Sequence, residues 1–168
     1  MIQWMYYPRS NRITAIGERL VEVFKTKAAS ITSASHDLDS NKVLAVVSEL
    51  LALEGFAVES GKKKVEKLPV PVLFGLNGKT EKSFDADAYH QAEGFVLEIE
   101  AGRAVANNQF LKDLFQACMM REVKYLAIAV RLEYRNNKDF DYVCKFFETL
   151  YASGRLSLPL LGILVIGY

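Results

Sequence analysis

The sequence predicts an α/β domain in which a mixed β-sheet carries helices on both faces. Two helical patterns come first, three or more extended segments follow, and the chain then alternates helix, strand, helix and strand. The composition, with 51% hydrophobic and 24% charged residues, is typical of a folded globular protein. A chain of 168 residues is long enough to bury one core without disulfides.

The first two segments read as amphipathic helices. Residues 12–29 repeat apolar side chains at helical spacing, and residues 30–40 are rich in Ser, Thr and Asp, as in a connection. Either Asp39 or Ser40 can cap the second helix, which spans about residues 41–54. Gly55 ends it, because a residue without a Cβ suits the left-handed position after a helix.

The middle of the chain reads as extended. A strand begins near Phe56, and Pro69 and Pro71 demote the next segment to a sheet edge, because proline donates no ladder hydrogen bond. Asn77-Gly78 is a strong signal for a hairpin turn. From Ser83 the sequence alternates apolar and polar residues, as a strand does.

The last part alternates helix and strand. We expect a helix over about residues 105–121 and another over 139–152 that stops near Gly154. Residues 123–132 are nearly all apolar, which predicts a strand covered on both faces. Residues 162–167 form a final apolar strand.

Charge, cysteines and hydropathy exclude several protein classes. The net charge of +1 is unlike that of a polycationic nucleic-acid coat. Cys118 and Cys144 sit in apolar helical patterns and read as reduced, buried residues, and no Cys/His spacing suggests zinc. No apolar stretch is long enough for a membrane span. We therefore expect a cytoplasmic protein with no membrane partner.

Acidic residues gather on two neighbouring strands between residues 84 and 104. In the second of these strands, Val96, Glu98 and Glu100 occupy the face opposite Phe95, Leu97 and Ile99. Residues i and i+2 on a strand lie roughly 6.5–7 Å apart, and paired strands roughly 4.8 Å apart. A hairpin therefore allows Asp87, Glu98 and Glu100 to converge on one point.

Converging carboxylates repel one another and lose solvation, so stability alone does not explain them. A hard divalent cation such as Mg²⁺ resolves the conflict, since it prefers oxygen ligands. The alternative is an ordinary amphipathic strand whose acidic face meets water. Asp85 is an alternative to Asp87, which we prefer because its connection to Glu98 is shorter.

The order of these elements resembles the core of the PD-(D/E)XK nuclease superfamily. SELLALEGFAVES (48–60) resembles its opening helix and first strand, and FDADAY (84–89) the strand with the metal-binding Asp. VLEIEAGRA (96–104) is similar to the strand with the second acid. The resemblance covers residues 41–132 and implies a restriction-endonuclease-like sheet flanked by helices. It makes residues 1–168 one domain, with a helical extension (1–40), a nuclease core (41–132) and a C-terminal helix and strand (133–168).

The resemblance also implies roles for individual residues. Asp87, Glu98 and the carbonyl of Ile99 would bind Mg²⁺, and Mn²⁺ would substitute for it. Glu100 stands where most members have lysine, although glutamate occurs there in some restriction enzymes. Glu100 would then orient the attacking water or act as a further ligand. Arg103, or a lysine from elsewhere, would supply the missing positive charge.

Weaker candidates surround this segment, and each also reads as an ordinary surface or core residue. They are Glu49 on the second helix, Tyr89 and His90 after the Asp strand, the lysines Lys62, Lys63, Lys64 and Lys67, and Asn107, Asn108, Gln109 and Lys112 beyond the second acidic strand.

Three functions compete at this stage. The leading one is a Mg²⁺-dependent endodeoxyribonuclease of restriction or repair type, with DNA as partner and a homodimer for duplex cleavage. The second is a nuclease-like domain without catalysis that binds nucleic acid or protein. The third is a protein–protein assembly domain, suggested by the aromatic segment MIQWMYYP at the N-terminus.

Overall fold

The computed structural model describes residues 1–61 and 63–168. The helices are α1 (Ala15–Thr26), α2 (Ala28–Ile31), α3 (Ser40–Leu53), α4 (Gln109–Met119) and α5 (Asp139–Ser153). The strands are β1 (Gln3–Tyr7), β2 (Ala57–Val58), β3 (Leu68–Phe74), β4 (Thr80–Ala86), β5 (Ala88–His90), β6 (Phe95–Glu100), β7 (Tyr125–Val130) and β8 (Gly162–Gly167).

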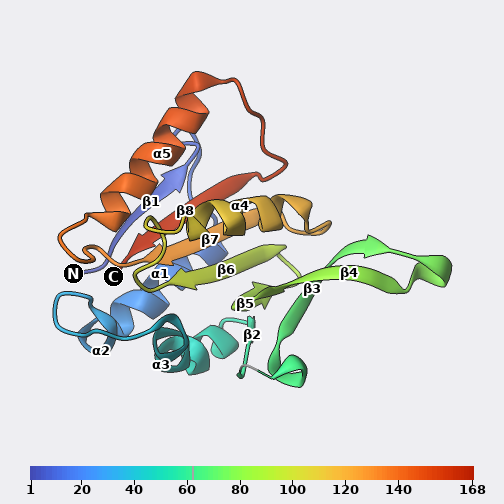
Figure 1. Cartoon of the computed structure of the whole chain (residues 1–168), viewed down its shortest axis with the longest axis horizontal. Coiled ribbons are helices and arrows are strands. Elements are labelled where there is room, and N and C mark those ends of the chain that lie inside the picture. The colour runs from blue at the N-terminus through green and yellow to red at the C-terminus, as the bar shows by residue number, and fades with distance from the viewer. Residues whose placement is uncertain (62) are drawn as a thin grey trace.

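A mixed six-stranded sheet forms the centre of the molecule, in the order β1-β8-β7-β6-β5-β2. Strands β6, β7 and β8 are parallel to one another, whereas β1, β5 and β2 pair antiparallel with their neighbours. β3 and β4 pair with each other in a separate two-stranded sheet that extends away from the body (Figure 1). The predicted mixed sheet is confirmed.

Helices cover both faces of the central sheet, as predicted. Helices α1, α2 and α3 pack on one face and α4 and α5 on the other (Figure 1). Side chains of β6 divide between the two layers, so Leu97 and Ile99 join the α1–α3 layer and Val96 joins the α4–α5 layer. The inner strands β7 and β8 are almost wholly buried, which explains their nearly continuous apolar sequence.

Several element boundaries follow the local signals in the sequence. Asp39 caps α3, because its side chain accepts a hydrogen bond of 2.9 Å from the backbone N–H of Lys42. Gly55 follows this helix with φ of +88°. Asn77 and Gly78 have φ of +58° and +72°, as the turn between β3 and β4 requires.

The N-terminal aromatic segment is a strand, which sequence patterning did not predict. β1 pairs antiparallel with β8 over its whole length, so residues 1–40 contribute a sheet strand as well as helices. Tyr6 and Tyr7 are buried, whereas Trp4 is 40% exposed. Most of this aromatic surface therefore covers the core rather than meeting a partner.

Two local predictions were wrong. The alternation predicted from Ser83 onward breaks at Asp87, because Ala86 packs in the α4–α5 layer and Ala88 in the α1–α3 layer. The helix expected from residue 105 begins only at Gln109, after Asn108 in a left-handed conformation (φ +53°). Both departures lie beside the acidic residues.

Two further findings concern the cysteines and the helices. Cys118 and Cys144 are free thiols, each partly buried, in agreement with the sequence expectation. No helix in the described part of the chain has both the length and the apolar character needed to cross a membrane.

Candidate metal and catalytic site

The register of β5 and β6 brings the predicted acids near one another. Ala88 pairs with Leu97, so the residue before Ala88, Asp87, lies beside Glu98. The side chain of Asp87 accepts a hydrogen bond of 2.7 Å from the backbone N–H of Ile99. The charge of Asp87 in turn raises the pKa of both Glu98 and Glu100.

A fourth acid, Asp113 on α4, joins this group. It is only 4% exposed, it shares a hydrogen bond with Glu100, and its Oδ2 has no hydrogen-bond partner. Sequence reasoning missed it, although a signal was present. Asp113 interrupts the buried face of α4, where Phe110, Leu114 and Ala117 are its neighbours. We call Asp87, Glu98, Glu100 and Asp113 the acidic cluster.

Burial makes every carboxyl group of the acidic cluster hard to ionise. Desolvation is the largest cause in each case, and repulsion from the other acids adds to it. The pKa of Asp87 rises to about 6, that of Glu100 to about 7 and that of Asp113 to about 8. The pKa of Glu98 is raised well above its ordinary value. Burying four carboxyl groups together lowers the stability of the fold, so a cluster of this kind indicates a functional site.

Positive charge acts on the acidic cluster from Lys112 on α4, and Lys67 also lowers the pKa of Asp87. The ammonium group of Lys112 lowers the pKa of all four acids, opposing the effect of burial. Arg103 acts on Glu100 alone among the four. Lys112 is exposed and projects from the helix that carries Asp113.

The structure distinguishes Asp85 from Asp87, the two aspartates that the sequence offered as the first metal ligand. Asp85 is exposed on β4, and its charge is not among the main influences on the pKa of any acid of the cluster. Glu59, by contrast, lies close enough to raise the pKa of Asp87. Its backbone N–H donates 2.8 Å to the carbonyl of Asp87, and its carboxylate pairs with Lys67 at 2.7 Å. Glu59 was not predicted.

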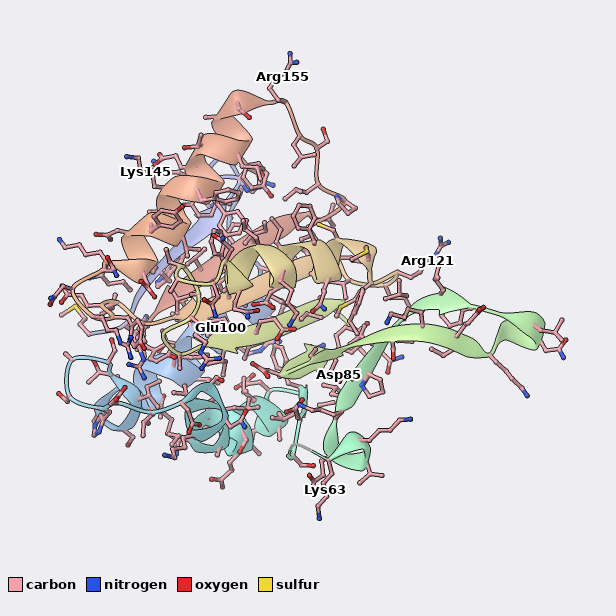
Figure 2. The ribbon with its side chains drawn as sticks, in the orientation of Figure 1. Lys63, Asp85, Glu100, Arg121, Lys145 and Arg155 are labelled. Carbon is pink, nitrogen blue, oxygen red and sulfur yellow. The ribbon has the colours of Figure 1, made fainter. Side chains whose placement is uncertain are left out.

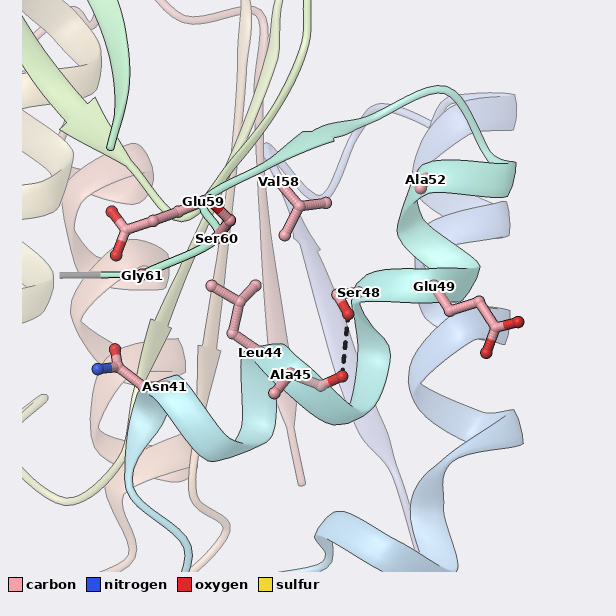
Figure 3. Close-up of a pocket in the computed structure, with 10 residues that line it drawn as sticks. All are labelled: Asn41, Leu44, Ala45, Ser48, Glu49, Ala52, Val58, Glu59, Ser60 and Gly61. Atoms are coloured by element: carbon pink, nitrogen blue, oxygen red, sulfur yellow. Dashed lines mark hydrogen bonds between the residues drawn. The ribbon is translucent and has the colours of Figure 1, made fainter. Parts of the chain in front are cut away.

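Two cavities flank the cluster and share the first turn of α3. One, of about 530 Å³, lies at the carboxyl end of β6 and is lined by Glu100, Arg103 and Arg131. The other, of about 540 Å³, lies between α3 and β2 and is lined by Glu59 (Figure 3). Asn41 lines both. Of the acidic cluster, Glu100 lines the first cavity, and none of the four acids lines the second.

Arg131 supports the wall of the first cavity. Its guanidinium donates 2.6 Å to the carbonyl of Leu38, pairs with Asp37 at 2.7 Å and lies 5.1 Å from the ring centre of Tyr134. It is 7% exposed. These contacts hold the segment before α3 against the end of β7.

Other sequence candidates lie outside the cluster or have structural contacts. Figure 3 shows the carboxylates of Glu49 and Glu59 pointing in opposite directions. Tyr89 is buried in the α4–α5 layer, and His90 packs edge-on against Phe56 at 5.2 Å. Among the lysines, Lys62 lies outside the described residues. Lys63, Lys64, Asn107 and Asn108 are exposed, and Gln109 begins α4 partly buried.

The donor atoms of the cluster suit a hard cation. All are carboxylate oxygens, which Mg²⁺ and Mn²⁺ accept, and the buried Oδ2 of Asp113 lacks a partner. Within residues 1–61 and 63–168, however, no three His, Cys, Asp or Glu side chains are already arranged as a metal-binding group. Binding an ion would therefore require these side chains to rotate toward it.

Comparison with known proteins identifies the fold. No family model and no curated protein matches the sequence. Among solved structures, the chain is similar to the crystal structure of free BglII, a restriction endonuclease, with a TM-score of 0.50 and 10% sequence identity. The match covers 99% of this chain and 78% of that one. The chain has a restriction-endonuclease-like fold.

At 10% identity this likeness concerns the fold and carries no residue roles. The restriction-endonuclease-like architecture expected from the acidic strands is confirmed. The assignment of Asp87, Glu98, Ile99 and Glu100 to metal binding and catalysis remains a prediction. Asp113 and Lys112 are two further candidate residues at the same site.

Proposed function

We propose that this protein is a Mg²⁺-dependent endodeoxyribonuclease of restriction or DNA-repair type that acts in the cytoplasm. The observation that carries the proposal is the acidic cluster, four carboxyl groups with raised pKa values inside a restriction-endonuclease-like fold. Duplex DNA would be cut by a homodimer, since the cluster provides one site per chain. Mn²⁺ would substitute for Mg²⁺ because it accepts the same oxygen ligands.

Asp87, Glu98 and the carbonyl of Ile99 would hold the cation. When bound, the ion would polarise the scissile phosphate and lower the pKa of a water molecule. Glu100 would orient this water and accept its proton. The water oxygen forms a new P–O bond, the ester P–O bond on the opposite side breaks, and the leaving oxygen takes up a proton.

Lys112 would stabilise the charge that develops on the phosphate. The charge of Lys112 lowers the pKa of all four acids, which supports this role. Lys112→Arg should keep part of the activity and Lys112→Met should lose about 10²-fold or more in kcat, by analogy with the loss of one stabilising donor. Equal activity of Lys112→Met and wild type would remove Lys112 from the mechanism.

Cleavage of a mixed DNA panel tests the proposal. Linear, branched and single-stranded DNA would be incubated with Mg²⁺ or Mn²⁺ and with wild type, Asp87→Ala or Glu98→Ala. Asp87→Ala and Glu98→Ala, purified identically, control for contaminating nuclease, and Glu49→Gln controls for replacement of an acid outside the cluster, since its carboxylate points away from Glu59. We expect cutting by wild type and Glu49→Gln only. Absence of wild-type cutting on every substrate would refute the nuclease.

A second candidate is a nuclease-like domain that binds nucleic acid or protein without catalysis. Glu100 in place of the usual lysine favours it. This candidate predicts either no site-specific Mn²⁺ binding or Mn²⁺ binding without cleavage. Calorimetry with wild type and Asp87→Ala separates it from the nuclease, since a heat of Mn²⁺ binding that depends on Asp87 would argue against a dead site.

A further inference from the structure

The hairpin of β3 and β4, residues 68–86, forms an arm that leaves the body of the molecule (Figure 1). Its base is anchored, because Val70 and Ala86 are buried in the α4–α5 layer and the N–H of Arg121 donates 3.4 Å to the carbonyl of Pro71. Its tip is different. Leu73, Phe74 and Leu76 are 57%, 51% and 85% exposed.

Exposed apolar side chains at the end of a two-stranded hairpin indicate a surface that binds a partner. An isolated hairpin is marginally stable in water, and an apolar tip adds the cost of hydrating its surface. Clustered exposed apolar residues of this kind mark interaction sites. The charge around the arm indicates which partner.

The arm and its base are basic. Between residues 63 and 86, which cover the arm and its base, the sequence has five lysines, two glutamates and one aspartate, a net charge of +2, although the whole chain carries only +1. Lys79 and Lys82 are exposed on the arm itself, and Lys64 is exposed at its base. Lys63, also exposed, lies beside Lys64 (Figure 2). Lys82 also lies over the ring of Phe84, with its Nζ 5.2 Å from the ring centre. Such a surface complements a polyanion.

The arm is also continuous with the candidate site. β4 ends at Ala86, directly before Asp87 of the acidic cluster. β4 has seven residues, so at about 3.3 Å per residue it extends about 23 Å. That length corresponds to about seven base pairs of duplex, at 3.4 Å each.

We propose that the arm binds duplex DNA in the major groove beside the acidic cluster. A two-stranded ribbon fits that groove, where Leu73, Phe74 and Leu76 would contact base edges, including thymine methyl groups. Lys79 and Lys82 would contact the flanking phosphates. The choice of DNA as the substrate rests on the proposed function. The arm would contact the DNA on one side of the cut, over a length of about seven base pairs.

The affinity for DNA, measured by fluorescence anisotropy with labelled duplexes of about 12 and about 26 base pairs, tests the role of the arm. Only the longer duplex extends far enough beyond the acidic cluster to contact the whole arm. Measurements in EDTA and in Ca²⁺, which takes the same oxygen ligands, avoid dependence on cleavage. Wild type should bind the longer duplex more tightly. The triple variant Leu73→Ser, Phe74→Ser, Leu76→Ser should bind it about 10- to 100-fold more weakly and gain little from its extra length.

Two further variants sharpen the test. Lys79→Ala with Lys82→Ala should reduce the slope of log affinity against log salt by about two. Leu156→Ser, an exposed apolar residue next to Arg155 and outside the arm, should leave binding unchanged (Figure 2). Circular dichroism and thermal melting of each variant check that the fold is intact.

Three outcomes overturn the proposal. They are wild type that binds neither duplex, a triple variant that binds both as wild type does, and a triple variant whose only change is the loss of a dimer in light scattering. Wild type that binds through the arm and cuts no DNA would instead refute the nuclease while upholding the arm. A triple variant that cuts and binds as wild type would refute the arm and leave the nuclease standing.

Discussion

The two faces of β6 meet different surroundings. Toward α1–α3 the strand presents Phe95, Leu97 and Ile99, each at most 2% exposed and packed in one apolar layer. Toward α4 it presents Val96, then Glu98 and Glu100, which lie among other acids. Six consecutive residues thus carry a face that stabilises the fold and a face that opposes it.

The difference shows where stability has been given up. Apolar burial on the first face contributes roughly 25 cal/mol per Å² removed from water. On the second face, burial raises the pKa values of Glu98 and Glu100, so ionising them in the folded protein costs free energy. A cation or a substrate-bound ion is the natural compensation for that cost. Four variants or conditions test this contrast.

Leu97→Ala should give the largest change in stability. Leu97 is fully buried in the α1–α3 layer, so its truncation removes apolar contacts and leaves a cavity. The free energy of unfolding should fall by about 2–5 kcal/mol in urea denaturation. Ile99→Val, on the same face, should cost only about 0.5–1.5 kcal/mol. Equal effects of the two would mean that this face is not tightly packed.

Raising the pH without divalent metal should weaken the fold. The pKa values of Asp87, Glu100 and Asp113 rise to about 6, 7 and 8, above their unfolded values near 4. At pH 5 and above, the folded protein therefore holds protons that the unfolded chain has largely lost, and Asp113 still holds about half of its proton at pH 8. The free energy of unfolding should fall over this window by a few kcal/mol, at about 1.4 kcal/mol per pKa unit.

Urea denaturation at several pH values, in EDTA, measures this dependence. Mn²⁺ should flatten it, because the ion favours the ionised carboxylates. A free energy of unfolding that stays constant or rises from pH 5 to pH 8 would contradict the raised pKa values.

Asp113→Asn should stabilise the metal-free protein at pH 8 by about 1–3 kcal/mol. The change removes a buried charge, and the amide can donate a hydrogen bond to Glu100, with which Asp113 already interacts. Mn²⁺ should stabilise this variant less than it does wild type. If the variant is instead less stable at pH 8, Asp113 has contacts that matter more than its charge.

Glu49→Gln should have the smallest effect. Glu49 is exposed on α3, and its carboxylate points away from Glu59. Its free energy of unfolding should remain within about 0.5 kcal/mol of wild type from pH 5 to pH 8. A larger change would show that exposed acids also contribute to the pH dependence.

Much of the fold could be predicted because its signals are local. The apolar run of β7, the Asn77-Gly78 turn and the glycine after α3 each reflect a backbone or burial requirement within a few residues. β1 could not be predicted this way. Its pairing with β8 joins the two ends of the chain, and no local pattern specifies that partner.

The acidic cluster likewise has a part that local sequence signals predict and a part that depends on contacts between distant segments. By itself the sequence determined that Asp87, Glu98 and Glu100 share one region, because strand periodicity and a short turn bring them near one another. Only the tertiary structure placed Asp113 and Lys112 there, since the packing of α4 on β6 decides which turn of the helix meets the acids. Local spacing sets what neighbouring residues can do together, whereas contacts between distant segments depend on the packing of the whole chain.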